Sequence, residues 1–78
     1  MSAEFNVIAF DNDGFWRYVS QSLGAEEAVI VARFVVDEAI RDGAISRVMI
    51  TDSDDFTNFL WETDKGVVFP PPVDPASP

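Results

Sequence analysis

One segment of the chain, residues 25–42, has a helical pattern that is bounded by glycine at both ends. Gly24 is an acceptable N-cap, and the acidic residues of the first turn suit the positive end of the helix dipole. Gly43 fits the left-handed position that follows many helices. At 100° per residue, the apolar side chains form one broad face made of Ala28, Val31, Ala32, Val35, Val36 and Ala39. The pattern therefore predicts an amphipathic helix with one face available for a core.

Two large apolar residues, Ile30 and Phe34, fall on the polar side of this helix, one turn apart. One interpretation places them at the edge of the core, under the chain termini or the proline-rich end. The other makes them half of a self-complementary patch in a two-fold dimer, where Arg33 and Asp37 pair across the axis. The flanking charges favour the dimer contact.

Short runs of strand-forming residues precede and follow the helix, at residues 5–10, 15–19, 45–52, 56–63 and 67–69. The tetrad Asp11-Asn12-Asp13-Gly14 is a strong signal for a hairpin turn between the first two runs. A helix of this length spans about 27 Å and a strand about 23 Å, so one helix can lie across one sheet. The order ββαβββ thus predicts an α+β fold, an antiparallel sheet with one helix packed on one face.

The end of the chain has a different composition, Pro-Pro-Pro-Val-Asp-Pro-Ala-Ser-Pro from residue 70 onward. Proline cannot donate a hydrogen bond to a sheet, so this segment reads as a polyproline or disordered tail. We therefore predict one domain at residues 1–70 and a tail at residues 71–78.

The residue types that are missing exclude most catalytic chemistry. The chain has no Cys and no His, which removes the thiolate nucleophile, the commonest general base and the commonest transition-metal ligands. The turn at residues 11–14 is similar to the opening of a calcium loop, but the glutamate that closes such a loop is absent. We expect no enzyme activity, no metal site and no cofactor.

The net charge of −9 bears on the partner and the compartment. Such a charge repels nucleic acid and anionic membranes, so the natural partner is a protein with a basic surface. The longest apolar run, Ala28 to Ala32, is far shorter than the roughly 20 residues of a membrane span. The first residues lack the positive segment of a signal peptide. We expect a cytoplasmic protein.

A single helix cannot cover both faces of the predicted sheet, and the strands are rich in large apolar residues. Some of these residues must then point away from the helix, in a patch that usually marks an interface. We expect the two tryptophans, Trp16 and Trp61, to contribute to binding a partner.

The acidic residues of the strands and turns collect at the two ends of the predicted sheet. The order of the elements places Asp11, Asp13, Glu62 and Asp64 near one end and Asp52, Asp54 and Asp55 near the other. Carboxylates at two ends of a small domain can imitate the negative phosphates that a nucleic-acid-binding protein binds. We predict that these seven carboxylates contact the partner. Turns are also where solvated acids ordinarily collect, so the placement alone is a modest signal.

Residues 1–70 resemble the small anti-CRISPR proteins encoded by phages and mobile elements, particularly those that act on type I surveillance complexes. The resemblance lies in the small size, the acidic turns at residues 11–14 and 53–55, the central helix and the lack of catalytic groups. It is a resemblance of type, so no residue role is carried over. It implies an inhibitor that occupies a basic nucleic-acid-binding surface and blocks recognition of target DNA. The alternative is a small adaptor that docks through exposed aromatic residues of the sheet.

Overall fold

The structure is a computed structural model, and it describes residues 4–69 of the chain. The tail predicted at residues 71–78 lies outside the described residues. The described part contains five strands and one helix, in the order β1 (Phe5–Asp11), β2 (Trp16–Leu23), α1 (Ala25–Asp42), β3 (Ile45–Asp52), β4 (Thr57–Glu62) and β5 (Gly66–Phe69).

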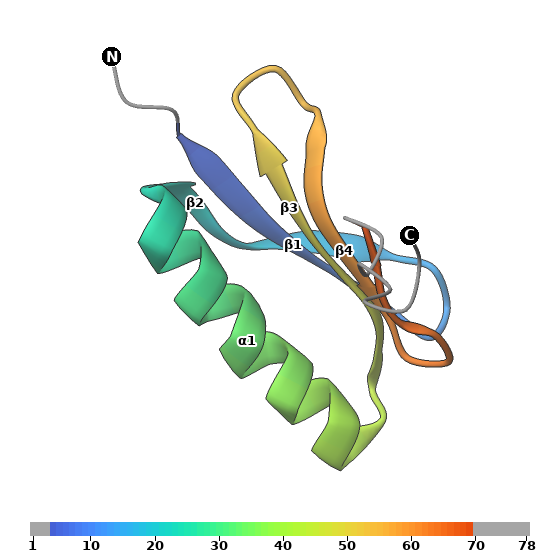
Figure 1. Cartoon of the computed structure of the whole chain (residues 1–78). Helices are drawn as coiled ribbons and strands as arrows, with labels where there is room; N and C mark the ends of the chain where they lie inside the picture. Colours follow the sequence, from blue (N-terminus) through green and yellow to red (C-terminus); the bar gives the residue numbers. More distant parts are fainter. Residues whose placement is uncertain (1–3, 70–78) are drawn as a thin grey trace, which may run out of the picture.

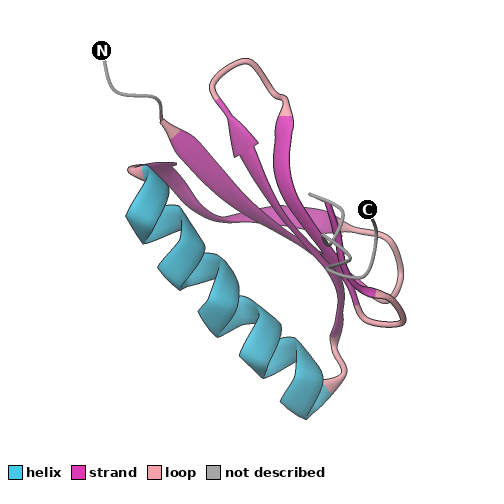
Figure 2. Ribbon diagram, viewed as in Figure 1, coloured by secondary structure: helices cyan, strands magenta, loops and turns pink. Residues whose placement is uncertain are grey.

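The strands form one antiparallel sheet with the spatial order β2-β1-β3-β4-β5 (Figure 1). Consecutive strands are neighbours except where the chain passes through α1, because the helix carries it from the edge strand β2 back to β3 beside β1. The helix lies on one face of the sheet (Figure 2). The predicted α+β fold, with the element order ββαβββ, is confirmed.

The helix begins and ends where the glycines predict. Gly24 has no side chain with which to cap the helix, but the Glu27 carboxylate accepts the Gly24 backbone N–H at 3.4 Å. At the other end, Gly43 has a φ of 68° and donates its N–H to the carbonyl of Ala39 at 2.9 Å. This left-handed conformation disfavours residues with a Cβ atom, which is why glycine ends the helix.

The core lies between α1 and the inner face of the sheet. Its buried members are Ala28, Ala32, Val35 and Ala39 from the helix and Val7, Ala9, Val48, Ile50 and Trp61 from the strands. Small alanines let the helix approach the sheet closely. The helix packs chiefly on β3 and β1, and to a smaller extent on β2. The inner face of β4 and β5 therefore extends beyond the helix to one side.

The second strand is longer than predicted, because it continues through Ser20, Gln21 and Ser22 to Leu23. These polar residues carry little strand signal of their own, and pairing with β1 imposes the extended conformation. The register shifts twice along this pair of strands. At the bulge, Ser22 has a φ of 57° and donates its N–H to the Asn6 Oδ1 at 3.1 Å.

Candidate interaction surfaces

The turn between β1 and β2 and the turn between β3 and β4 share a sequence pattern, Asp-x-Asp-x-Phe, at residues 11–15 and 52–56. In both, the first aspartate donates its N–H to the carbonyl of the closing phenylalanine, at 2.9 and 3.0 Å. The fourth residue has a positive φ, 89° at Gly14 and 64° at Asp55. These are three-residue hairpin loops with a bulge at the left-handed residue. The hairpin predicted at residues 11–14 is therefore present.

The first aspartate of each turn uses its carboxylate to hold the turn together. The Asp11 Oδ1 accepts the backbone N–H groups two and four residues further on, at 2.9 and 3.0 Å. The Asp52 Oδ1 accepts the equivalent pair, each at 3.0 Å, and the Asp52 Oδ2 also accepts the amide of Asn58 at 3.2 Å. Two of the acids that the sequence assigned to partner binding thus have a structural role.

The Asp52 hydrogen bonds lower the pKa of its carboxyl below the usual value of 3.8. The amide of Asn58 has the largest effect, desolvation opposes it, and the backbone N–H groups of Phe56 and Asp54 lower the pKa further. A lowered pKa in the folded state means that the ionised carboxylate stabilises the fold. This stabilisation is fully present above the unfolded value of 3.8 and is lost as the pH falls through the lower, folded value.

We therefore expect Asp52→Ala to lower the melting temperature at neutral pH more than Asp54→Ala does, because the Asp54 side chain accepts none of the turn's hydrogen bonds. The gap between the wild-type protein and Asp52→Ala should narrow as the pH falls below 3.8. Thermal melts of the three proteins across that range test the expectation. A gap that stays constant with pH would show that the charge of Asp52 contributes nothing.

The end of the domain that carries the β3–β4 turn is acidic. Three segments meet at this end, because strand pairing joins them: residues 4–7, 20–28 and 51–58. None of the five basic residues lies in these segments, which contain Glu4, Glu26, Glu27, Asp52, Asp54 and Asp55. We call these six residues the acidic end. All charged side chains of these three segments are negative, and Arg33 is the base that lines the adjoining groove together with Phe5 and Asn58.

The opposite end carries acids as well, and bases lie among them. The predicted residues Asp11, Asp13, Glu62 and Asp64 do lie there, together with Arg17, Arg41, Arg47 and Lys65. Glu62 pairs with Arg47 at 3.7 Å. Glu38 and Asp42 of α1 lie at this end as well, so six acids outnumber the four bases there and the end stays negative, with charges of both signs mixed on its surface.

The outer face of the sheet, opposite the helix, is apolar and aromatic. Because side chains alternate along a strand, the residues between those of the core point to this side. Cross-strand pairs place together Ile8, Phe10, Trp16, Tyr18, Met49, Leu60 and Phe69, which we call the outer face. The Trp16 and Tyr18 rings meet edge to face with centroids 5.4 Å apart, and Trp16 is 55% exposed. No described element covers this face (Figure 2).

The two tryptophans have opposite environments, which corrects the expectation for Trp61. Trp61 pairs with Val48, points toward the helix and is only 7% exposed. It belongs to the core and cannot anchor a partner on the surface. Sequence alternation correctly places Phe59 and Trp61 on one face and Leu60 on the other, but it does not tell which face the helix covers.

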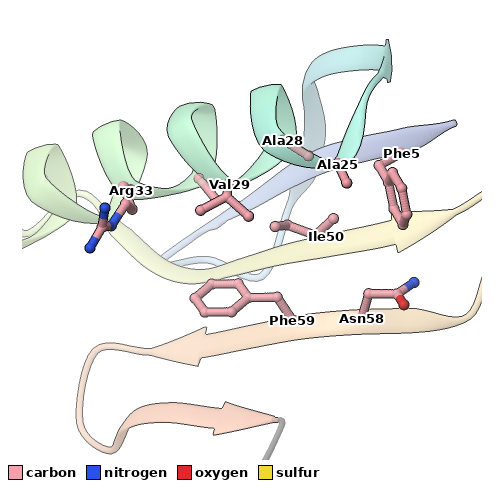
Figure 3. A pocket seen from close by; sticks show the side chains of 9 residues that line it. Phe5, Ala25, Ala28, Val29, Arg33, Ile50, Asn58 and Phe59 are labelled. Carbon is pink, nitrogen blue, oxygen red and sulfur yellow. The ribbon is translucent and has the colours of Figure 1, made fainter.

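A groove of about 340 Å³ lies between α1 and β4, where the sheet extends beyond the helix (Figure 3). Val29 from the helix and Phe59 from β4 face each other across it, and Phe5 and Ile50 contribute to its floor. Arg33 is the one charged residue among those that line it. The groove is therefore an apolar surface next to the exposed side of the helix.

The outward side of α1 bears the two apolar residues singled out by the sequence. Ile30 is 67% exposed and Phe34 is 62% exposed, so neither belongs to the edge of the described core. Val29 and Ile40 are exposed as well. Within residues 4–69, no side chain covers this side of the helix substantially, and the interpretation as an edge of the core is not supported there.

Sequence reasoning overlooked the two phenylalanines that close the twin turns. Phe15 is 74% exposed and Phe56 is 69% exposed, the largest values among the large hydrophobic residues described. Phe56 projects from the middle of the acidic end. The repeated Asp-x-Asp-x-Phe pattern could have indicated their exposure. In both turns the phenylalanine follows a left-handed residue at the tip of a hairpin, where few neighbouring side chains can cover it.

Comparisons with protein-family models, with curated proteins and with solved structures find no match to this chain. Among residues 4–69, no group of three or more acidic side chains is arranged so that it could hold a metal ion. The described helix is not long and apolar enough to cross a membrane.

Proposed function

We propose that this chain is a non-enzymatic inhibitor that binds a basic, nucleic-acid-binding surface of a partner protein through its acidic end. The observation that carries the proposal is the group of six carboxylates in three segments that contain no base. A groove that binds phosphate presents Lys and Arg side chains, and complementary potentials steer such partners together. The protein would act in the cytoplasm of a bacterial host.

Phe56 gives the acidic end an apolar anchor. Its side chain is mostly exposed and stands directly after Asp54 and Asp55. Interfaces take much of their affinity from a few buried aromatic residues, whereas an isolated exposed ion pair contributes only about 0–1 kcal/mol. An aromatic residue surrounded by carboxylates combines a specific anchor with long-range attraction.

The candidate partner is a type I CRISPR surveillance complex, in keeping with the resemblance to anti-CRISPR proteins. The direct test is competition. The protein is titrated against a purified surveillance complex with labelled target duplex, at two salt concentrations. We expect release of the duplex, with a weaker effect at the higher salt because screening reduces the attraction between charged surfaces. Duplex binding that is unchanged at saturating protein would refute the proposal for that complex.

A second candidate function is supported by the outer face, whose aromatic residues Trp16, Tyr18 and Phe69 are exposed in the described part of the chain. A small adaptor could dock this face on a partner with no involvement of nucleic acid. Docking of this kind depends on apolar contact, so its affinity should respond little to salt. The salt dependence of binding thus separates the two functions.

A further inference from the structure

The outward side of α1 is an apolar surface that the described part of the chain does not use. Large side chains at Ile30, Phe34 and Ile40 are each more than half exposed, and Val29 is about half exposed. On a helix, these positions lie opposite or beside the buried stripe formed by Ala28, Ala32, Val35 and Ala39. Exposed apolar surface of this extent is typical of an interface.

Four charged residues lie along the middle of the same side of the helix, and their signs alternate. From the N-terminus to the C-terminus they are Glu26, Arg33, Asp37 and Arg41, while Glu27 and Glu38 lie at the margin of this side, next to Phe34. Among the described residues the one ion pair joins Arg47 to Glu62, so none of these four is in an ion pair there. A partner helix with the same alternation in the reverse direction would complement all four.

We propose that α1 packs antiparallel against α1 of a second copy of this chain, so that the protein is a two-fold symmetric homodimer. A two-fold axis that crosses the helix near residue 35 brings Arg33 beside Asp37 of the other copy. The same packing brings Ile30 beside Ile40 of the other copy. Glu26 then approaches Arg41 of the other copy, less than one turn out of register, within reach of these long side chains.

The opposite orientation is unfavourable. In a parallel two-fold pair each residue meets its own copy, so Arg33 would face Arg33 and Asp37 would face Asp37. The helix dipoles also favour the antiparallel pair. The acidic end lies at the helix N-terminus, so antiparallel packing separates the two acidic ends by about a helix length, roughly 27 Å. That separation limits repulsion between two chains with a net charge of −9 each.

The exposed side of the helix is continuous with the groove beside it. Val29 belongs to both, because it is exposed on α1 and lines the groove opposite Phe59 (Figure 3). Further along the helix, a second hollow lies between α1 and β5, and Val36 of the helix and Val67 of the strand line it. Side chains from the second α1 can therefore fill space that the helix of one copy leaves open over β4 and β5.

The mass of the full chain in solution, measured by sedimentation equilibrium, tests the proposal. We expect a mass of about twice 8.6 kDa for the wild-type protein. Phe34→Ser should raise the dissociation constant at least tenfold. Phe56→Ser is the matched control, because it removes a similarly exposed phenylalanine from the β3–β4 turn, outside the proposed helix contact, and should leave the dimer unchanged. A wild-type protein that stays monomeric at high micromolar concentration, or a Phe34→Ser variant as dimeric as the control, would overturn the proposal.

Mixing two charge variants tests whether residues 33 and 37 make the contact between the two copies. Arg33→Asp and Asp37→Arg should each dissociate the dimer, because like charges then meet across the axis. An equimolar mixture should form a heterodimer, since each chain offers the charge that the other lacks. Circular dichroism establishes that both variants keep their helix. If the separate variants are monomeric and their mixture stays monomeric, the antiparallel pairing is wrong.

Discussion

Val35→Asp is expected to unfold the domain. Val35 is only 5% exposed and lies on the helix face that packs on the sheet. An aspartate there would place an unpaired carboxylate in an apolar core, at a cost of about 3–5 kcal/mol. A domain with 66 described residues has a free energy of unfolding of roughly 3–10 kcal/mol. One buried charge removes a large part of that stability, or all of it.

The matched control for this experiment is Val29→Asp, the same substitution in the same helix at a half-exposed position. It carries the same loss of helix propensity without burying the charge. Thermal melts by circular dichroism are compared at low protein concentration, where association contributes little. The packing described for α1 would be contradicted if Val35→Asp melted within a few degrees of Val29→Asp.

The parts of the fold with strong local signals could be predicted from the sequence. The helix bounds follow from the apolar period and from the glycine at each end, since only glycine takes the left-handed conformation at residue 43 without strain. Residues 45–52 were predicted as a strand with the observed bounds. The end of β2 was missed, because Ser20 to Ser22 depend on tertiary pairing with β1 and have no alternation of their own.

The candidate site was only partly predictable, because exposure and charge balance depend on pairing. Alternation places Trp61 and Leu60 on opposite faces, but only the strand register and the position of the helix decide that Trp61 is buried. The acids were assigned to the correct ends. Whether an end is acidic overall depends on the bases that the sheet brings beside it, such as Arg47 beside Glu62.

The hydrogen bonds of Asp52 also change how the acidic end should be altered. Neutralising Asp52, Asp54 and Asp55 together would remove charge and also weaken the turn that Asp52 holds. A cleaner variant is Asp54→Asn with Asp55→Asn, which leaves Asp52 in place. Asparagine is among the residues best suited to the left-handed conformation at position 55, where φ is 64°. The fold should therefore survive, and a change in binding can be attributed to charge.

This double variant should bind the partner at least tenfold more weakly, a cost of about 1.4 kcal/mol. The reason is that charge pairs made close in an interface can each contribute more than about 1.5 kcal/mol. The control is Asp13→Asn with Asp64→Asn, which removes the same charge from the opposite end, where four bases lie among the acids. Long-range attraction falls equally in both variants, so a difference between them reports the site of contact.

Contact through the acidic end is measured by the concentration of each double variant that displaces labelled duplex from the type I surveillance complex. We expect Asp54→Asn with Asp55→Asn to raise this concentration at least tenfold, while Asp13→Asn with Asp64→Asn leaves it close to that of the wild-type protein. If the wild-type protein displaces the duplex and both double variants do so equally well, the acidic end does not make the contact. The claim would then be contradicted, and the outer face would be the surface to alter next.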